Sequence, residues 1–86
     1  MIHVKTSAGF EADISENVRD NIELLDALAD LEGGNGLALS RVVQQVMGDS
    51  KKALYDFCRG EDGVVPTTAV SEQLMEIIKQ VGGKNS

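Results

Sequence analysis

The sequence has few aromatic residues, one cysteine, one histidine and one proline in 86 positions. Phe10, Tyr55 and Phe57 are its only aromatic residues, so the aromatic platforms on which many proteins stack nucleic-acid bases are not expected. The single cysteine, Cys58, excludes an internal disulfide and a multi-cysteine metal site. No apolar run approaches the roughly 18 residues that a membrane-spanning helix needs. The first residues also lack the apolar run of a signal peptide, which predicts a cytosolic protein.

Basic residues are also scarce. The chain has 8 basic against 14 acidic side chains, a net charge of −6, which argues against non-specific binding to DNA, RNA or anionic membranes. A chain of 86 residues is one domain at most. With 42% apolar residues it is too hydrophobic for a disordered acidic tail, yet short enough to leave apolar surface outside one small core.

The hydrophobic pattern predicts a mainly α-helical fold with a small N-terminal β-hairpin and a compact bundle of about four helices, all in a single domain over 1–86. Apolar and polar residues alternate on both sides of Gly9, which predicts the hairpin over 1–14. Apolar residues then recur at helical spacing. The predicted helices cover 15–32, 37–47, 50–59 and 67–81, and 82–86 should form a frayed tail.

The predicted helix over 15–32 carries an unusually wide apolar arc. One face at 100° per residue holds Ile14, Val18, Ile22, Leu25 and Ala29. A second apolar group lies between this face and the polar side: Leu24, Leu28 and Leu31. Together they cover about half of the helix, more than the roughly 100° stripe of an ordinary surface helix. The second group either packs beneath a neighbouring helix or stays on the surface and binds another chain.

An acidic stripe occupies the nearly opposite face of the same helix. Its members are Glu16, Asp20, Glu23, Asp26 and Asp30. One interpretation is a solvated face that keeps the protein soluble. The other is a charged surface that meets a basic partner or mimics nucleic acid. The candidate partner-binding residues are therefore Leu24, Leu28, Leu31, Glu16, Asp20 and Glu23.

Residue types that could support catalysis do not form a recognisable constellation. His3 is expected at a solvent-facing strand edge, and Cys58 on the apolar side of a short helix. The segment 34–36 follows a helix rather than a strand and lacks the lysine of a phosphate-binding loop. The acids Glu61 and Asp62, taken with Asp56, lack the alternating spacing of a calcium loop. We expect that the protein is not an enzyme and that it has neither a cofactor nor a metal site.

Several segments together resemble one protein family. They are Lys5-Thr6-Ser7-Ala8-Gly9-Phe10-Glu11, Glu23-Leu24-Leu25-Asp26-Ala27-Leu28-Ala29, Gly36-Leu37-Ala38-Leu39, Gly48, Leu54, Arg59-Gly60-Glu61-Asp62-Gly63-Val64-Val65-Pro66, and a last amphipathic helix leading to Lys84-Asn85-Ser86. Over nearly its whole length the chain resembles the small tail assembly chaperones of long-tailed phages and prophages of Gram-positive bacteria. The turn over 61–66 is the most telling segment. The chain departs from the pattern at Asn21-Ile22, where many members of the family have an aromatic residue.

The resemblance implies a non-catalytic chaperone that works in the cytoplasm of the host bacterium and is absent from the mature virion. Its partners would be the tape measure protein, which it coats, and the tail tube protein, whose subunits it recruits. The resemblance also implies a short form whose longer counterpart arises by ribosomal frameshifting. A second copy of the chain is a further candidate partner through self-association, and neither nucleic acid nor membrane is an expected partner. The alternative hypothesis is an acidic interaction protein that mimics nucleic acid and blocks a host DNA-binding protein.

Overall fold

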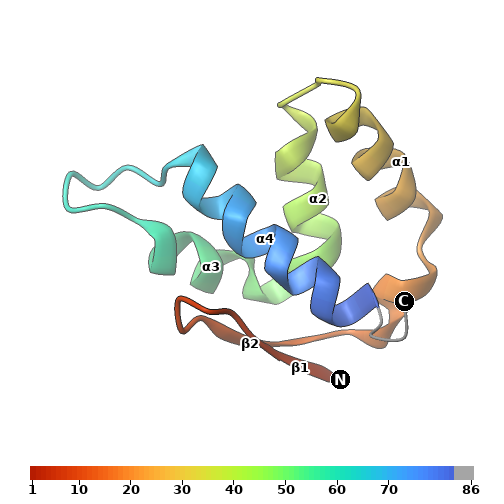
Figure 1. The fold of residues 1–86 in the computed structure, drawn as a ribbon, viewed down its shortest axis with the longest axis horizontal. Helices are drawn as coiled ribbons and strands as arrows, with labels where there is room; N and C mark the ends of the chain where they lie inside the picture. The colour runs from red at the N-terminus through yellow and green to blue at the C-terminus, as the bar shows by residue number, and fades with distance from the viewer. Residues whose placement is uncertain (83–86) are drawn as a thin grey trace.

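The computed structural model describes residues 1–82 as a two-stranded hairpin followed by helices (Figure 1). The elements, in chain order, are β1 (Ile2–Lys5), β2 (Glu11–Ile14), the 3₁₀ helix η1 (Glu16–Asp20), α1 (Ile22–Glu32), α2 (Ala38–Met47), the 3₁₀ turn η2 (Gly48–Ser50), α3 (Lys51–Cys58) and α4 (Thr67–Gly82). The predicted fold class, mainly helical with a small N-terminal hairpin, is confirmed.

The hairpin forms where apolar and polar side chains alternate. Its antiparallel strands pair Ile2 with Ile14 and Val4 with Ala12. Gly9 adopts a φ of 102°, which only glycine takes up readily and which the tight turn requires. One face of the hairpin buries Val4 and Ile14 in the core. Because an isolated hairpin is only marginally stable in water, the helices that cover this face stabilise it.

The helices pack around one core, to which every α-helix contributes. α1 and α2 form an antiparallel pair, and α4 runs beside the hairpin (Figure 1). The largest side chains with almost no exposure come from both strands and from α2, α3 and α4: Ile14, Leu54, Leu74, Ile77, Val4, Val42 and Val43. α4 faces this core with an apolar stripe of Val70, Leu74, Ile77 and Val81.

Two polar contacts fix α4 against β1 and the hairpin turn. The Ser7 backbone N–H and hydroxyl donate to the two carboxylate oxygens of Glu76, at 2.8 and 2.9 Å. The Gln80 side-chain amide donates to the Lys5 carbonyl at 2.8 Å and accepts from its N–H at 3.2 Å. These side chains therefore satisfy backbone groups of the hairpin that have no strand partner on that edge.

The prediction of one helix over 15–32 is wrong. Residues 16–20 form the 3₁₀ helix η1, and Asn21 has extended backbone angles (φ −130°, ψ 107°) before α1 begins. The Asn21 side-chain oxygen accepts hydrogen bonds from the N–H groups of Glu23 and Leu24, at 3.0 and 3.4 Å. This N-cap gives the backbone a favourable alternative to continuing the helix, and the chain changes direction there.

The other helix boundaries differ slightly from those predicted. The helix predicted over 37–47 is α2, which begins at Ala38, and the helix predicted over 50–59 is α3, which continues directly from η2. No side chain caps the start of α3 among the described hydrogen bonds. α4 extends the helix predicted over 67–81 by one residue, so Gly82 is still helical. The rest of the predicted tail, 83–86, lies outside the described residues.

Candidate partner-binding surface

The outer face of α1 carries an apolar strip that the core does not cover. Ile22 is 68% exposed and Leu25 is 60% exposed, and Ala29 is exposed beside them. Their spacing of three and four residues places them on one face of the helix. We call Ile22, Leu25 and Ala29 the outer strip. Since contiguous exposed apolar side chains mark interaction sites, the outer strip is the first candidate for binding another chain.

The three leucines predicted to bind a partner lie on the opposite face. Leu24 is buried with 5% exposure, and Leu28 and Leu31 are half-buried against the core. The surface interpretation of these leucines is therefore wrong, and the packing interpretation is confirmed. Leu24 and Ala27 face α2, and the face carrying Ile22 turns outward. The reason is that carboxylates lie on both sides of the Ile22 face and would lose their hydration if it were buried.

Carboxylates flank the outer strip. At 100° per residue, Glu23, Asp26 and Asp30 lie along one side of the strip and Glu32 lies on the other. All four are exposed, and α1 contains no basic residue. The outer strip is thus an apolar band within a negatively charged surface.

A groove between α1 and α2 adjoins this surface. It has a volume of about 330 Å³ and is lined by Glu23, Asp26, Ala27, Arg41 and Gln45. The Arg41 guanidinium donates to the Asp30 carboxylate, and Glu23 and Asp26 form no ion pair within residues 1–82. We call this cavity the acidic groove. A cation placed in it would meet two carboxylates that are not neutralised by a described neighbour.

The acidic row predicted along one helix is divided between two elements. Glu16 and Asp20 lie on η1, and the Glu16 carboxylate is 3.7 Å from the Met1 amino group. Glu23 lies on α1 at the acidic groove. Of the predicted partner-binding residues, the structure therefore brings only Glu23 to the outer strip.

A separate hollow, apolar in its lining, lies where the chain enters α2 and α4. Its volume is about 280 Å³, and Leu37, Leu39, Tyr55, Val65 and Val70 supply its apolar lining. Leu37, at its edge, is 87% exposed. No sequence pattern predicts this hollow, because it forms only when the chain segments before α2 and before α4 are brought together.

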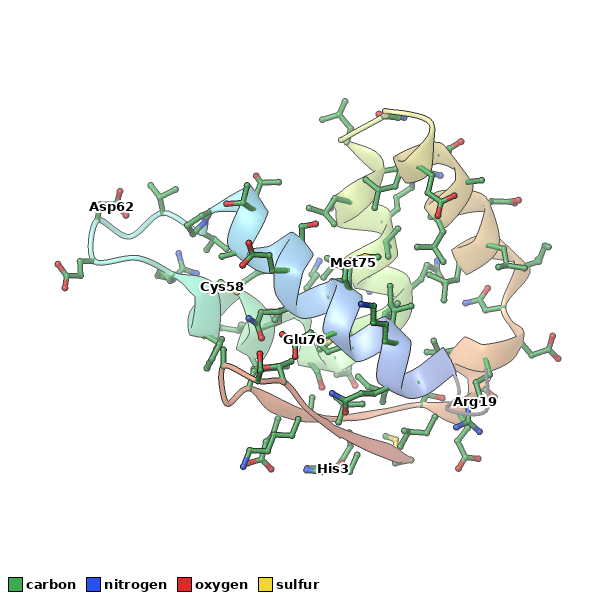
Figure 2. All side chains as sticks on the ribbon, viewed as in Figure 1. His3, Arg19, Cys58, Asp62, Met75 and Glu76 are labelled. Carbon is green, nitrogen blue, oxygen red and sulfur yellow. The ribbon has the colours of Figure 1, made fainter. Side chains whose placement is uncertain are left out.

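His3 lies on the outer face of the hairpin between two acids (Figure 2). Its Nδ1 is 2.9 Å from an Asp13 carboxylate oxygen, and its Nε2 is 3.0 Å from one of Glu11. Hydrogen bonds to Asp13 first and Glu11 second raise the pKa of the imidazole, because both favour its charged form. In this geometry His3 is part of a surface ion-pair cluster.

Cys58 lies at the end of α3, away from His3 (Figure 2). It is a free, half-buried thiol, and burial raises the pKa of that thiol. A raised pKa keeps the group protonated near neutral pH and makes it a poor nucleophile. Within residues 1–82, no three histidine, cysteine or carboxylate side chains are arranged to hold a metal ion.

No helix in the part of the chain up to Gly82 combines the length and the apolar composition needed to cross a membrane. No family model, no curated protein and no solved structure matches this chain.

Proposed function

We propose that this protein is a non-catalytic phage tail assembly chaperone that binds the tape measure protein and helps to recruit tail tube subunits. In this proposal it acts in the cytoplasm of the host bacterium and leaves before the virion is complete. The family is suggested by the sequence segments that resemble the tail assembly chaperones, above all the turn over 61–66. The observation that carries the binding role is the outer strip, a run of exposed apolar side chains on a helix whose other face is already used by the core.

Such a surface suits a long helical partner. An amphipathic helix binds by laying its apolar face against another apolar surface. Each Å² of apolar contact contributes about 25 cal/mol, much of it offset by the entropy lost on association. One small chain therefore offers a modest interface, and many copies along a single long partner would bind it through avidity. The acidic surface would keep the coated partner soluble.

The test is co-expression with the cognate tape measure protein. We expect the tape measure protein to move from the insoluble to the soluble fraction and to elute with this protein in size-exclusion chromatography. A tape measure protein that stays equally insoluble, with no complex eluting, would refute the proposal. An unrelated acidic protein of similar size serves as the control for a general effect of charge.

The alternative function, an acidic mimic that blocks a DNA-binding protein, predicts a different response to mutation. A mimic depends on its carboxylates, whereas Ile22 and Leu25 interrupt the acids on the outer face of α1. Competition against a host DNA-binding protein should then vanish when the acids of η1 and α1 become amides and persist when Leu25 becomes glutamine. The chaperone proposal predicts that Leu25→Gln alone weakens partner binding.

A further inference from the structure

We infer that the outer strip and the acidic groove together form a docking surface for a basic amphipathic helix. The apolar stripe of that helix covers Ile22, Leu25 and Ala29. One of its lysines or arginines enters the groove beside Glu23 and Asp26. The inference deepens the proposed function. The identity of the partner as the tape measure protein rests on that function. The chemistry of the partner, a basic amphipathic helix, follows from the surface itself.

The apolar part of this surface has the dimensions of a short helix contact. Ile22 and Ala29 are seven residues apart, which at 1.5 Å per residue places them about 10 Å apart along the axis of α1. That length matches about two turns of a partner helix. Leu25, 60% exposed, lies between them at the centre of the strip.

The charges select a basic partner. Glu23, Asp26 and Asp30 lie along one edge of the strip and Glu32 along the other, so a helix seated on the strip would be flanked by carboxylates. Arg41 cannot neutralise all of them because its guanidinium already binds Asp30. Complementary charge at such edges increases the association rate and disfavours partners of the wrong sign.

The acidic groove adds a defined position for one cation. Glu23 and Asp26 line it together with Gln45, whose side-chain oxygen accepts a hydrogen bond of 2.8 Å from the Asn21 amide. The Asn21 side chain therefore joins the cap of α1 to the wall of the groove. A lysine or arginine entering here would form charge-assisted hydrogen bonds with carboxylates held on a capped helix.

A second copy of this chain is a poor occupant of the same surface. A two-fold contact would place the outer face of one α1 against the same face of its partner. Carboxylates would then oppose carboxylates around a small apolar strip, which is unfavourable.

The direct test uses a synthetic peptide of about 18 residues, long enough to form a helix, with a leucine stripe flanked by lysines. A control peptide has glutamate in place of every lysine. We expect the lysine peptide to bind the full chain at least about tenfold more tightly than the glutamate peptide in fluorescence anisotropy. Equal binding of the two peptides would overturn the inference.

Variants of the chain locate the site. Leu25→Gln should weaken binding of the lysine peptide about tenfold, since a leucine contact at the centre of the strip is lost. Leu37→Gln makes the same change at another highly exposed leucine and should change affinity less than about twofold. Circular dichroism checks that both variants fold. Equal losses in the two variants would overturn the inference.

Two matched double variants test how much the carboxylates contribute to the affinity for the lysine peptide. The double variant Glu23→Gln, Asp26→Asn should reduce affinity several-fold at about 50 mM NaCl and much less at about 300 mM, where screening is stronger. Glu61→Gln, Asp62→Asn removes the same two charges from the exposed turn before α4 (Figure 2) and should have little effect. Equal losses in the two double variants would show that only net charge matters and would overturn the inference.

Co-expression separates this inference from the proposed function. If wild type and Leu25→Gln solubilise the tape measure protein equally well, the docking surface is wrong and the chaperone function stands. If wild type fails to solubilise it but the lysine peptide binds at Leu25, the docking surface stands and the chaperone function is wrong.

Discussion

The side-chain oxygen of Asn21 accepts a hydrogen bond of 3.0 Å from the backbone N–H of Glu23. This contact begins α1 and ends the run of 3₁₀ helix before it. It also marks the start of the face that packs on α2, since Leu24 and Ala27 in the first turns of α1 are buried. Leu25 lies on the other face, whose flanking carboxylates would lose their hydration if that face were buried.

Replacing Asn21 with alanine should lower the free energy of unfolding by about 1 kcal/mol, the usual effect of losing an N-cap. Loss of the Asn21 hydrogen bond to Gln45 should add to this effect. Urea denaturation followed by circular dichroism measures the change. Asn17→Ala is the control, because Asn17 hydrogen-bonds Ser15 through its backbone N–H rather than its side chain. An equal loss of stability in both variants would contradict the role of the cap.

The same residue shows where sequence patterns are sufficient and where they are not. The hairpin and α4 follow from periodicity. Strict alternation of apolar and polar residues fits only a strand, and apolar residues at helical spacing over 67–81 fit only a helix. Between 15 and 32 the apolar residues keep a helical spacing on both sides of Asn21, and asparagine is tolerated within helices. Whether it caps or continues the helix depends on competition for the Glu23 and Leu24 N–H groups, which periodicity does not report.

The candidate surface was less predictable than the fold. The width of the apolar arc correctly indicated surplus apolar surface on this helix, but the exposed residues are Ile22 and Leu25 rather than Leu24, Leu28 and Leu31. An arc of that width can bury either half, and the choice depends on how α1 is oriented against α2. The acidic groove requires Arg41 and Gln45 from α2, so no pattern within 15–32 could have predicted it.

The His3 cluster should make stability depend on pH. Hydrogen bonds to Asp13 and Glu11 raise the pKa of His3 above its ordinary value of 6.5 in the folded protein. The stabilisation is thus fully present below 6.5 and is lost as the pH rises through the folded-state pKa. The difference in melting temperature between wild type and His3→Gln should therefore be larger at about pH 6 than at about pH 9.

An NMR titration provides a direct check on this prediction. His3 is the only histidine, so its ring resonances are unambiguous. Its titration midpoint should lie above 6.5, and replacing Asp13 with asparagine should move it back toward that value. A wild-type midpoint at or below 6.5 would contradict the hydrogen-bonded geometry.

Glu76 should hold the hairpin turn against α4. Two hydrogen bonds from Ser7, from its backbone N–H first and its hydroxyl second, lower the pKa of the Glu76 carboxyl. In Glu76→Ala, we expect faster amide hydrogen exchange at Ser7 and in the turn around Gly9, because the N–H of Ser7 loses its acceptor. Glu72→Ala, one turn earlier on α4 and exposed, should leave exchange in the hairpin unchanged. Equal exchange at Ser7 in wild type and Glu76→Ala would rule out the contact.

Stability from this contact should fall in acid. A carboxyl whose pKa is lowered on folding stabilises the protein at pH values above its ordinary pKa, which is 4.5 for Glu76. This stabilisation is lost as the pH falls through the folded-state pKa. Wild type and Glu76→Ala should therefore converge in melting temperature as the pH is lowered below about 4. A difference between the two that stays constant from neutral to acid pH would mean that the charge of Glu76 has no part in holding the turn.

Gln73 is the position where a substitution should increase stability. Only 9% of this α4 residue is exposed, and its side-chain oxygen has no hydrogen-bond partner among the described residues. A buried acceptor without a partner costs about 1–3 kcal/mol in lost hydration. Methionine has a similar length and a similar helix propensity, so Gln73→Met should remove this cost without creating a cavity.

We expect Gln73→Met to raise the free energy of unfolding by about 1 kcal/mol in urea denaturation. Gln44→Met makes the same change at an exposed position on α2 and should stay within about 0.5 kcal/mol of wild type. A loss of stability in Gln73→Met would mean that the amide is hydrogen-bonded in solution, through water or a shifted neighbour. Because Gln73 lies on α4 and outside the docking surface, binding of the lysine peptide should be unchanged in this variant, which separates core stability from partner recognition.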